Sequence, residues 1–342
     1  MLQDSDSWLD LLQQGLAQAR AGEFDNALDH FERARQLAPT RPETACALGR
    51  EHMRRGQLEE ALALLEEAWN QDRSLVTAGT SLARCLGLDL EQFLEAHAVL
   101  DDVDARFPNE ATSRLIRAEI LLAEGRHEEA SVVSEALLES TSERVSQSAT
   151  LLMARVENER GLRAIRSGGL ERAIFAFKRA GDLDENWAAP QSNLGATFEK
   201  LGRLQRAEAA YRSALERDPT YARGWHNLYL LYQRQNDSRA GDCVERAFRA
   251  DTASVPITTD FALSLLGDDD PDSAKAILAC HAHGLGDLCD SWASLVMPLA
   301  RGGSRELAEF CLEKAKERST DPDLIARTEA LLEGAMRGPA KA

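Results

Sequence analysis

The stretch that decides the fold is AAPQSNLGATFEKLGRLQRAEAAYRSALERDPTY, residues 188–221. Its apolar residues recur at helical spacing in two short segments. Gly202 falls between the segments, where a left-handed residue can end a helix, and Pro219 closes the second segment. Three small residues fall where two antiparallel helices would cross closely, and three large ones would fill the space between them. They are Gly195, Ala207 and Ala214, and Leu194, Phe198 and Tyr211.

The same spacing of small, large and turn-forming residues recurs along almost the whole chain. Nine units of about 34 residues can be aligned. Units one, two, five, six and seven match best, unit nine less well, and units three, four and eight weakly. A helical pair cannot bury its apolar face alone, so the units must stack on one another. A last amphipathic segment, Pro322–Met336, is expected to cap the end of the stack.

This pattern resembles the tetratricopeptide repeat family, in which each unit is a helix, a turn and a second helix. Residues 188–221 follow the family pattern except at Gln191, where the family has tryptophan. The resemblance implies an all-α fold, a right-handed superhelical α-solenoid of antiparallel helix pairs. It also implies a protein that binds other proteins.

Departures from the repeat length predict irregularities in the stack. The third unit carries an extra residue within 87–91, and residues 139–149 exceed what the repeat needs. Residues 252–259, which contain Pro256, are expected to form an irregular loop. We divide the chain into three blocks: 1–141 with repeats one to four, 142–251 with repeats five to seven, and 252–342 with repeats eight, nine and the cap.

The composition indicates which classes of partner are disfavoured and in which compartment the protein is expected. The 342 residues carry a formal net charge of −17, which disfavours nucleic acids and anionic membranes through long-range repulsion. No segment approaches the roughly 18 apolar residues of a membrane span. The six cysteines are scattered without a paired framework, which indicates a reducing compartment. Since residues 1–6 also lack the features of a leader, we expect a cytoplasmic protein without nucleic-acid partners or membrane insertion.

The sequence offers little catalytic or metal-binding chemistry. Cys280, His281, His283 and Cys289 are the one group with zinc-like ligands, but their spacing fits no standard zinc motif. The acidic run at 268–272 is better explained as a helix cap, with Asp270 before Pro271. No phosphate-binding, nucleophile-elbow or zinc-protease motif occurs. We therefore expect no enzyme activity, no cofactor and no metal.

The resemblance places the first helix of each unit along a concave binding surface. Polar and basic residues occupy the expected surface positions of units five to seven. They are Arg155, Asn158, Arg166, Asn193, Lys200, Arg223, His226, Asn227 and Arg234. Asn193 and Asn227 share one position in consecutive units, and their amides could hold a peptide backbone. An open surface could equally tolerate asparagine, and the basic residues that recur at helix C-termini are equally explained by the helix dipole.

These observations lead to two functional hypotheses. The first is a scaffold, adaptor or assembly factor that belongs to a larger complex. Its groove would hold another protein or a peptide segment, either acidic or extended. The alternative is a regulatory subunit that responds to a ligand or peptide and controls an associated enzyme or transcription factor.

Overall fold

The computed structural model describes residues 7–286, 288–319 and 321–336, and within them it contains helices and no strand. Residues 1–6, on which the expectation about a leader depends, lie outside the described residues. The first ten elements are α1 (Trp8–Ala21), α2 (Phe24–Leu37), α3 (Pro42–Arg54), α4 (Leu58–Gln71), α5 (Val76–Arg84), the π-helix η1 (Cys85–Asp89), α6 (Phe93–Arg106), α7 (Ala111–Ala123), α8 (His127–Glu135) and α9 (Glu143–Arg166). The others are α10 (Leu170–Leu183), α11 (Ala188–Lys200), α12 (Leu204–Arg217), α13 (Ala222–Arg234), α14 (Ala240–Ala250), α15 (Val255–Gly267), α16 (Pro271–Gly284), α17 (Cys289–Arg301), α18 (Arg305–Glu317) and α19 (Pro322–Met336).

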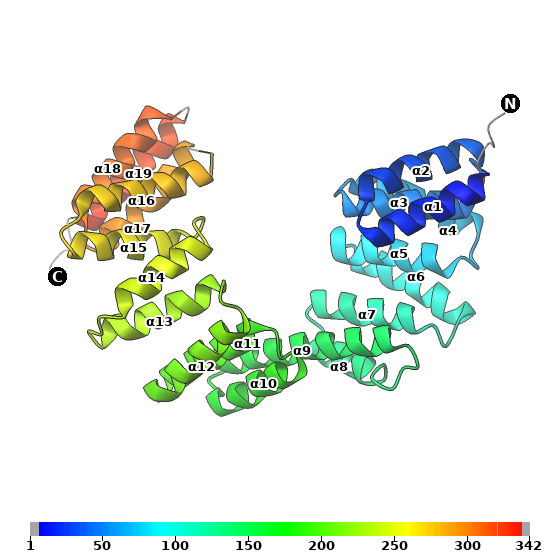
Figure 1. Ribbon diagram of the computed structural model, residues 1–342, viewed down its shortest axis with the longest axis horizontal. Helices are drawn as coiled ribbons and strands as arrows, with labels where there is room; N and C mark the ends of the chain where they lie inside the picture. Colours follow the sequence, from blue (N-terminus) through cyan, green and yellow to red (C-terminus); the bar gives the residue numbers. More distant parts are fainter. Residues whose placement is uncertain (1–6, 287, 320, 337–342) are drawn as a thin grey trace. The chain divides into compact units, whose positions relative to one another are not determined.

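The helices form nine successive pairs followed by one helix, as the repeat predicts (Figure 1). The chain divides into two compact units, Met1–Arg160 and Gly161–Ala342, and the division falls inside α9. Within each unit, the second helix of a pair packs on the first helix of the next, as α2 does on α3 and α12 on α13. The predicted all-α stack of helix pairs is therefore confirmed. The three blocks drawn from repeat quality remain a prediction.

Glycine lets the two helices of a pair approach each other. A Cβ atom placed on Gly195 of α11 would lie 2.6 Å from two ring atoms of Tyr211 on α12. Likewise, a Cβ atom placed on Gly15 of α1 would lie 2.6 Å from Cε1 of Phe31 on α2. Both rings are almost fully buried, so the small residue and the large one fill a single space between the helices. This close approach is the reason for the spacing of small and large residues in the sequence.

The turns explain two features of the repeat. Gly202 has a φ of 70°, so it supplies the predicted left-handed residue after α11. In the third unit, η1 takes up the predicted extra residue, because one additional residue in a helix is accommodated as a π-turn. Glu91 then occupies the left-handed position, with a φ of 55°, where most units have glycine and units seven and eight have Asn236 and Asp269.

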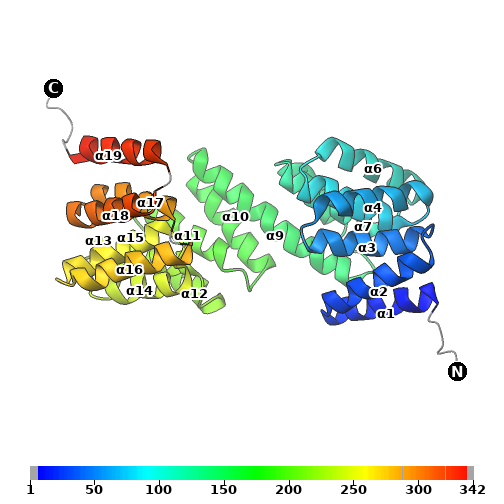
Figure 2. The same cartoon turned by 90° about the horizontal axis from the view of Figure 1, so that it is seen from above.

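Three predictions concern the chain from residue 252 onward: one is wrong and two are confirmed. Residues 252–259 are not an irregular loop, because α15 begins at Val255. Pro256 lies in the first turn of this helix, where its missing N–H is not needed. Asp270 caps α16 by accepting a hydrogen bond from the Ser273 backbone N–H, as expected. Helix α19 has the predicted bounds and packs on α17 and α18 at the end of the C-terminal unit (Figure 2).

Candidate partner-binding faces

The first helices of the C-terminal unit are joined by polar contacts between consecutive repeats. Asn227 Nδ2 on α13 donates a hydrogen bond to Ser192 Oγ on α11 at 3.0 Å. On the other side, His226 Nε2 donates to Asp260 Oδ2 on α15 at 2.7 Å. Arg234 forms an ion pair with Glu199, again between α13 and α11. We call these side chains on α11, α13 and α15 the C-terminal polar face.

The structure places the nine predicted contact residues in different environments. Asn193, His226 and Asn227 are partly buried on the C-terminal polar face. Arg166, Lys200, Arg223 and Arg234 are exposed in the same unit. Arg155 and Asn158 belong to the N-terminal unit, where Arg155 is exposed and Asn158 is only 6% exposed. Asn158 therefore has little surface to offer a partner.

The sequence predicts a basic face, but in the structure carboxylates pair with residues of this face. Glu199 forms an ion pair with Arg234, and Asp260 accepts a hydrogen bond from His226, so the C-terminal polar face is mixed in charge. A signal was present in the sequence, because Asp260 occurs 34 residues after His226, at the same position of the next repeat. The side-chain pairing itself depends on how consecutive helices pack, which the sequence pattern does not state.

The N-terminal unit has a groove of its own, which the sequence-based prediction did not include. It is an open groove with a volume of about 820 Å³, lined by the first helices α3, α5 and α7 and by the start of α9. Four arginines and one carboxylate supply its charged groups. They are Arg50, Arg54, Arg84, Arg144 and Glu119. We call this feature the N-terminal groove.

One ion pair crosses the floor of the N-terminal groove. Arg84 Nη2 lies 3.0 Å from Glu119 Oε2, which joins α5 to α7. Burial raises the pKa of Glu119, and Arg84 and Arg155 act in the opposite direction. Arg54 pairs with Glu51 at 2.9 Å. Within the described residues, Arg50 and Arg144 make no ion pair, so the groove carries positive charge that the chain itself does not neutralise.

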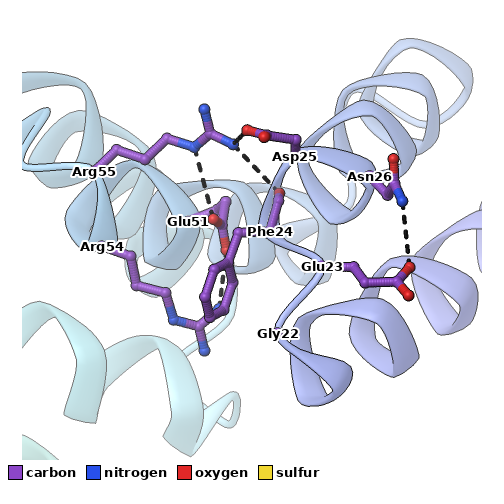
Figure 3. A pocket seen from close by; sticks show the side chains of 8 residues that line it. All are labelled: Gly22, Glu23, Phe24, Asp25, Asn26, Glu51, Arg54 and Arg55. Atoms are coloured by element: carbon purple, nitrogen blue, oxygen red, sulfur yellow. Dashed lines mark hydrogen bonds and ion pairs between the residues drawn. The ribbon is translucent and has the colours of Figure 1, made fainter.

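A pocket between repeats one and two is lined by charged residues that satisfy one another (Figure 3). The carboxylate of Glu51 is 1% exposed and accepts a hydrogen bond from Arg54. Arg55 Nη2 donates to Asp25 Oδ1 at 2.7 Å, and the Arg54 guanidinium lies 5.1 Å from the centre of the Phe24 ring. These contacts tie the turn before α2 to the end of α3, so the pocket has a structural role.

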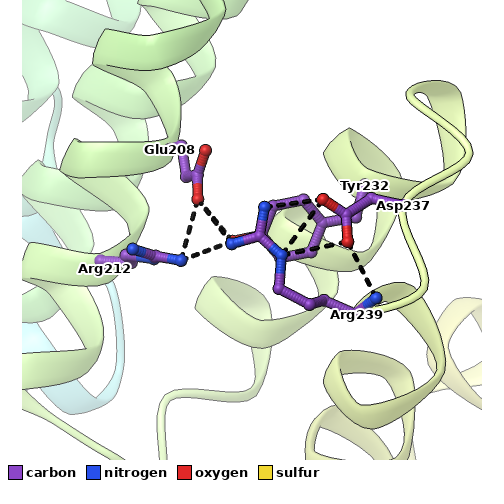
Figure 4. Close-up of polar contacts among 5 residues, drawn as sticks. All are labelled: Glu208, Arg212, Tyr232, Asp237 and Arg239. Atoms are coloured by element: carbon purple, nitrogen blue, oxygen red, sulfur yellow. Dashed lines mark hydrogen bonds and ion pairs between the residues drawn. The ribbon is translucent and has the colours of Figure 1, made fainter.

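A second polar cluster joins repeats six and seven through hydrogen bonds and ion pairs (Figure 4). Tyr232 donates to Glu208 at 2.7 Å, and Arg239 donates to Glu208 at 3.0 Å while its guanidinium lies 4.1 Å from the Tyr232 ring centre. Burial opposes ionisation of Glu208, but its hydrogen bonds and the nearby arginines hold its pKa below the ordinary value. The hydrogen bonds of Arg239 lower the pKa of Asp237 to about 2.

The cysteine and histidine group considered for zinc is dispersed. Cys280 is exposed, whereas His281 is buried, with its Nδ1 2.8 Å from the Thr252 carbonyl oxygen. In the part of the chain that the structure describes, no three His, Cys, Asp or Glu side chains are placed to hold a metal ion. In that same part, no helix has the length and apolar character of a membrane-spanning segment.

Comparisons with known proteins agree with the fold. Tetratricopeptide repeat families match residues 87–142 and 191–221, and the family described as anaphase-promoting complex, cyclosome, subunit 3 matches residues 20–103. A comparison with curated protein sequences found no match. The chain therefore contains tetratricopeptide repeats, and its described helices form nine pairs and a last helix.

Similar solved structures share this architecture. A monomeric mutant of IFIT1 with Gppp-AAAA has a TM-score of 0.54 and 16% identity, over 91% of this chain and 72% of that one. The human IFIT1 dimer with m7Gppp-AAAA has a TM-score of 0.53 and 16% identity, over 92% and 72% of the two chains. A tetratricopeptide repeat protein from Parabacteroides merdae has a TM-score of 0.51 and 16% identity, over 75% and 98%. At such identities the likeness shows the fold alone.

Proposed function

We propose that this protein is a non-catalytic, cytoplasmic scaffold or assembly factor whose C-terminal polar face holds an extended segment of a partner protein. One observation carries the proposal: polar side chains on three consecutive first helices are joined by hydrogen bonds from repeat to repeat. Such contacts hold the side chains in place before a partner arrives. Preorganisation of this kind lowers the entropy lost on binding.

The chemistry of the face suits a peptide backbone. Asn193 and Asn227 recur at an interval of 34 residues on α11 and α13, and each amide can both donate and accept hydrogen bonds. Exposed Lys200 and Arg223 lie on the same two helices and can pair with acidic side chains of the partner. Contacts to the backbone supply affinity, and the cations favour an acidic segment.

The IFIT1 structures contain 5′-capped RNA, so RNA is a partner to weigh for this chain. Two features disfavour it. The C-terminal polar face places Glu199 and Asp260 beside its cations, and the whole chain has a net charge of −17. A phosphate backbone carries a charge at every nucleotide, so it is repelled by these carboxylates more than a peptide with separate acidic side chains is, and we propose a protein partner and no nucleic acid.

The test is a double substitution, Asn193→Ala with Asn227→Ala. Partners captured by the full-length protein are identified by affinity purification and mass spectrometry and then compared between variants. We expect the double variant to lose partner capture while it keeps its helical circular dichroism, because the lost Asn227 to Ser192 bond is worth only about 1 kcal/mol. Asn109→Ala with Asn186→Ala, at two exposed turn positions, is the matched control. Undiminished capture by the double variant would show that this face is not the binding site.

A further inference from the structure

The N-terminal groove is rich in positive charge, although the chain as a whole is acidic. Its lining includes four arginines and a single carboxylate, although the protein as a whole has 57 acidic and 40 basic residues. Glu119 is paired with Arg84, which leaves a net positive groove in an acidic protein. Charge of one sign gathered in a concave surface favours a ligand of the opposite sign.

The arginines differ in their freedom to meet a ligand. Arg50 on α3 and Arg144 on α9 have no ion pair within the described residues, and Arg144 is exposed. Arg54 and Arg84 are paired, yet 41% and 46% of their side-chain surfaces remain accessible. Guanidinium groups bind carboxylates through two parallel hydrogen bonds. The groove therefore offers carboxylate-binding groups on three helices.

Aliphatic and hydroxyl groups line the groove between the arginines. The aliphatic side chains are Met53, Leu115, Ile116 and Val145. The hydroxyl groups come from Thr77, Thr80, Ser81, Thr112, Ser142 and Ser148. Apolar side chains of a ligand can lie against the partly exposed Met53 and Leu115, and a peptide backbone can bond to the hydroxyls of the exposed residues Thr77 and Thr112.

This lining distinguishes a peptide from a nucleic acid. Proteins that bind single-stranded RNA stack its bases on aromatic side chains. The described lining of the N-terminal groove contains no aromatic residue, so bases would find no stacking partner there. Aliphatic side chains beside arginines instead match a peptide that alternates acidic and aliphatic residues.

We infer that the N-terminal groove binds an extended acidic peptide segment whose carboxylates pair with Arg50 and Arg144 and whose aliphatic side chains contact Met53 and Leu115. The inference rests on the proposed scaffold function and adds a second binding surface with a defined class of ligand. It gives the N-terminal unit its own selectivity, separate from the C-terminal polar face. The two surfaces can therefore be tested independently.

Fluorescence anisotropy with the full-length protein tests the inference. The probe is a labelled synthetic peptide of repeated Glu-Glu-Leu, compared with Glu-Glu-Ala and Lys-Lys-Leu peptides of the same length. We expect the first peptide to bind best and added salt to weaken its binding. Arg50→Gln with Arg144→Gln should weaken binding about tenfold or more, since it removes two charge-assisted contacts without breaking an ion pair. Arg33→Gln, at an exposed arginine of α2, is the control and should bind as the wild type does.

Three results would overturn the inference. The first is a Glu-Glu-Leu peptide that does not bind, and the second is binding that the Arg50 and Arg144 substitutions leave unchanged. The third is an oligoadenylate that binds as tightly as the peptide and loses its affinity with the same substitutions, because the groove would then be a general polyanion site. The Asn193 and Asn227 double variant should still bind the peptide. Loss of partner capture in that variant would support the scaffold function even if the peptide fails to bind the groove.

Discussion

Gly195→Ala tests the close packing of helix pairs on which the stack depends. The added Cβ would lie 2.6 Å from Cδ1 and Cε1 of Tyr211, whereas ordinary contacts begin at 3.4 Å. The ring would have to withdraw, but Tyr211 is 1% exposed and its hydroxyl donates to Glu199 Oε2 at 2.9 Å. Neither its packing nor its hydrogen bond allows that movement without strain.

The expected magnitude is a balance of two effects. Overpacking a well-filled core costs about 1–3 kcal/mol. Replacing glycine with alanine inside a helix recovers about 0.5–1 kcal/mol. We therefore expect a net loss of about 1–2 kcal/mol in the stability of repeat six.

Hydrogen exchange measured by mass spectrometry resolves this loss within the stack. Amides of α11 and α12 should exchange about 5–30 times faster in the variant, while helices of the N-terminal unit keep their rates. Gly241→Ala is the matched control, because Gly241 lies in α14 and nothing stands within 4 Å of an added Cβ. Exchange in α11 and α12 that is unchanged or slower in Gly195→Ala would refute the packing argument.

Three further predictions concern a turn, the thiols and the response to acid. Glu91→Gly should raise the free energy of unfolding by about 0.5–1 kcal/mol in urea melts, because glycine adopts the left-handed conformation without strain; a less stable variant would contradict this. Iodoacetamide should label exposed Cys280 in the folded protein and leave Cys311 unmodified until urea unfolds it, since burial raises the pKa of the Cys311 thiol to about 12. Early labelling of Cys311 would show that repeat nine opens. Glu208→Gln should destabilise the protein at neutral pH. A carboxylate with a lowered pKa stabilises the fold above its ordinary value of 4.5, so the difference from wild type should shrink as the pH falls below that value and the carboxylate is protonated. A difference in melting temperature that stays constant with pH would exclude this contribution.

Much of the fold could be predicted from residues that meet inside one repeat. Gly195, Tyr211 and Gly202 are separated by fixed intervals, and their contacts are made within a single pair of helices. The extra residue near η1 and the bounds of α19 were predicted for the same reason, because they are departures from a regular interval. The loop predicted at 252–259 is wrong because Pro256 does not break the helix: proline is tolerated in the first turn, where it lies in α15.

The candidate sites depend on contacts between repeats, which the spacing of residues within one repeat does not describe. The pairing of His226 with Asp260 changes the charge of the C-terminal polar face, and it requires α13 and α15 to lie at a particular distance. The arginines of the N-terminal groove are not among the predicted contact residues, because the four helices of the groove belong to repeats two to five. Two of these, repeats three and four, match the pattern weakly. Its charge becomes apparent only when the arginines with and without ion pairs can be told apart.

The sequence by itself determined that the chain forms nearly identical helix pairs, because the shape of each pair is set by local residues that recur at a constant interval. Only the tertiary structure decided which charges are neutralised and where a groove remains open. Packing between neighbouring repeats brings together side chains more than thirty residues apart, such as Arg84 and Glu119, and the electrostatic energy of such a pair depends on a distance that only the folded stack sets.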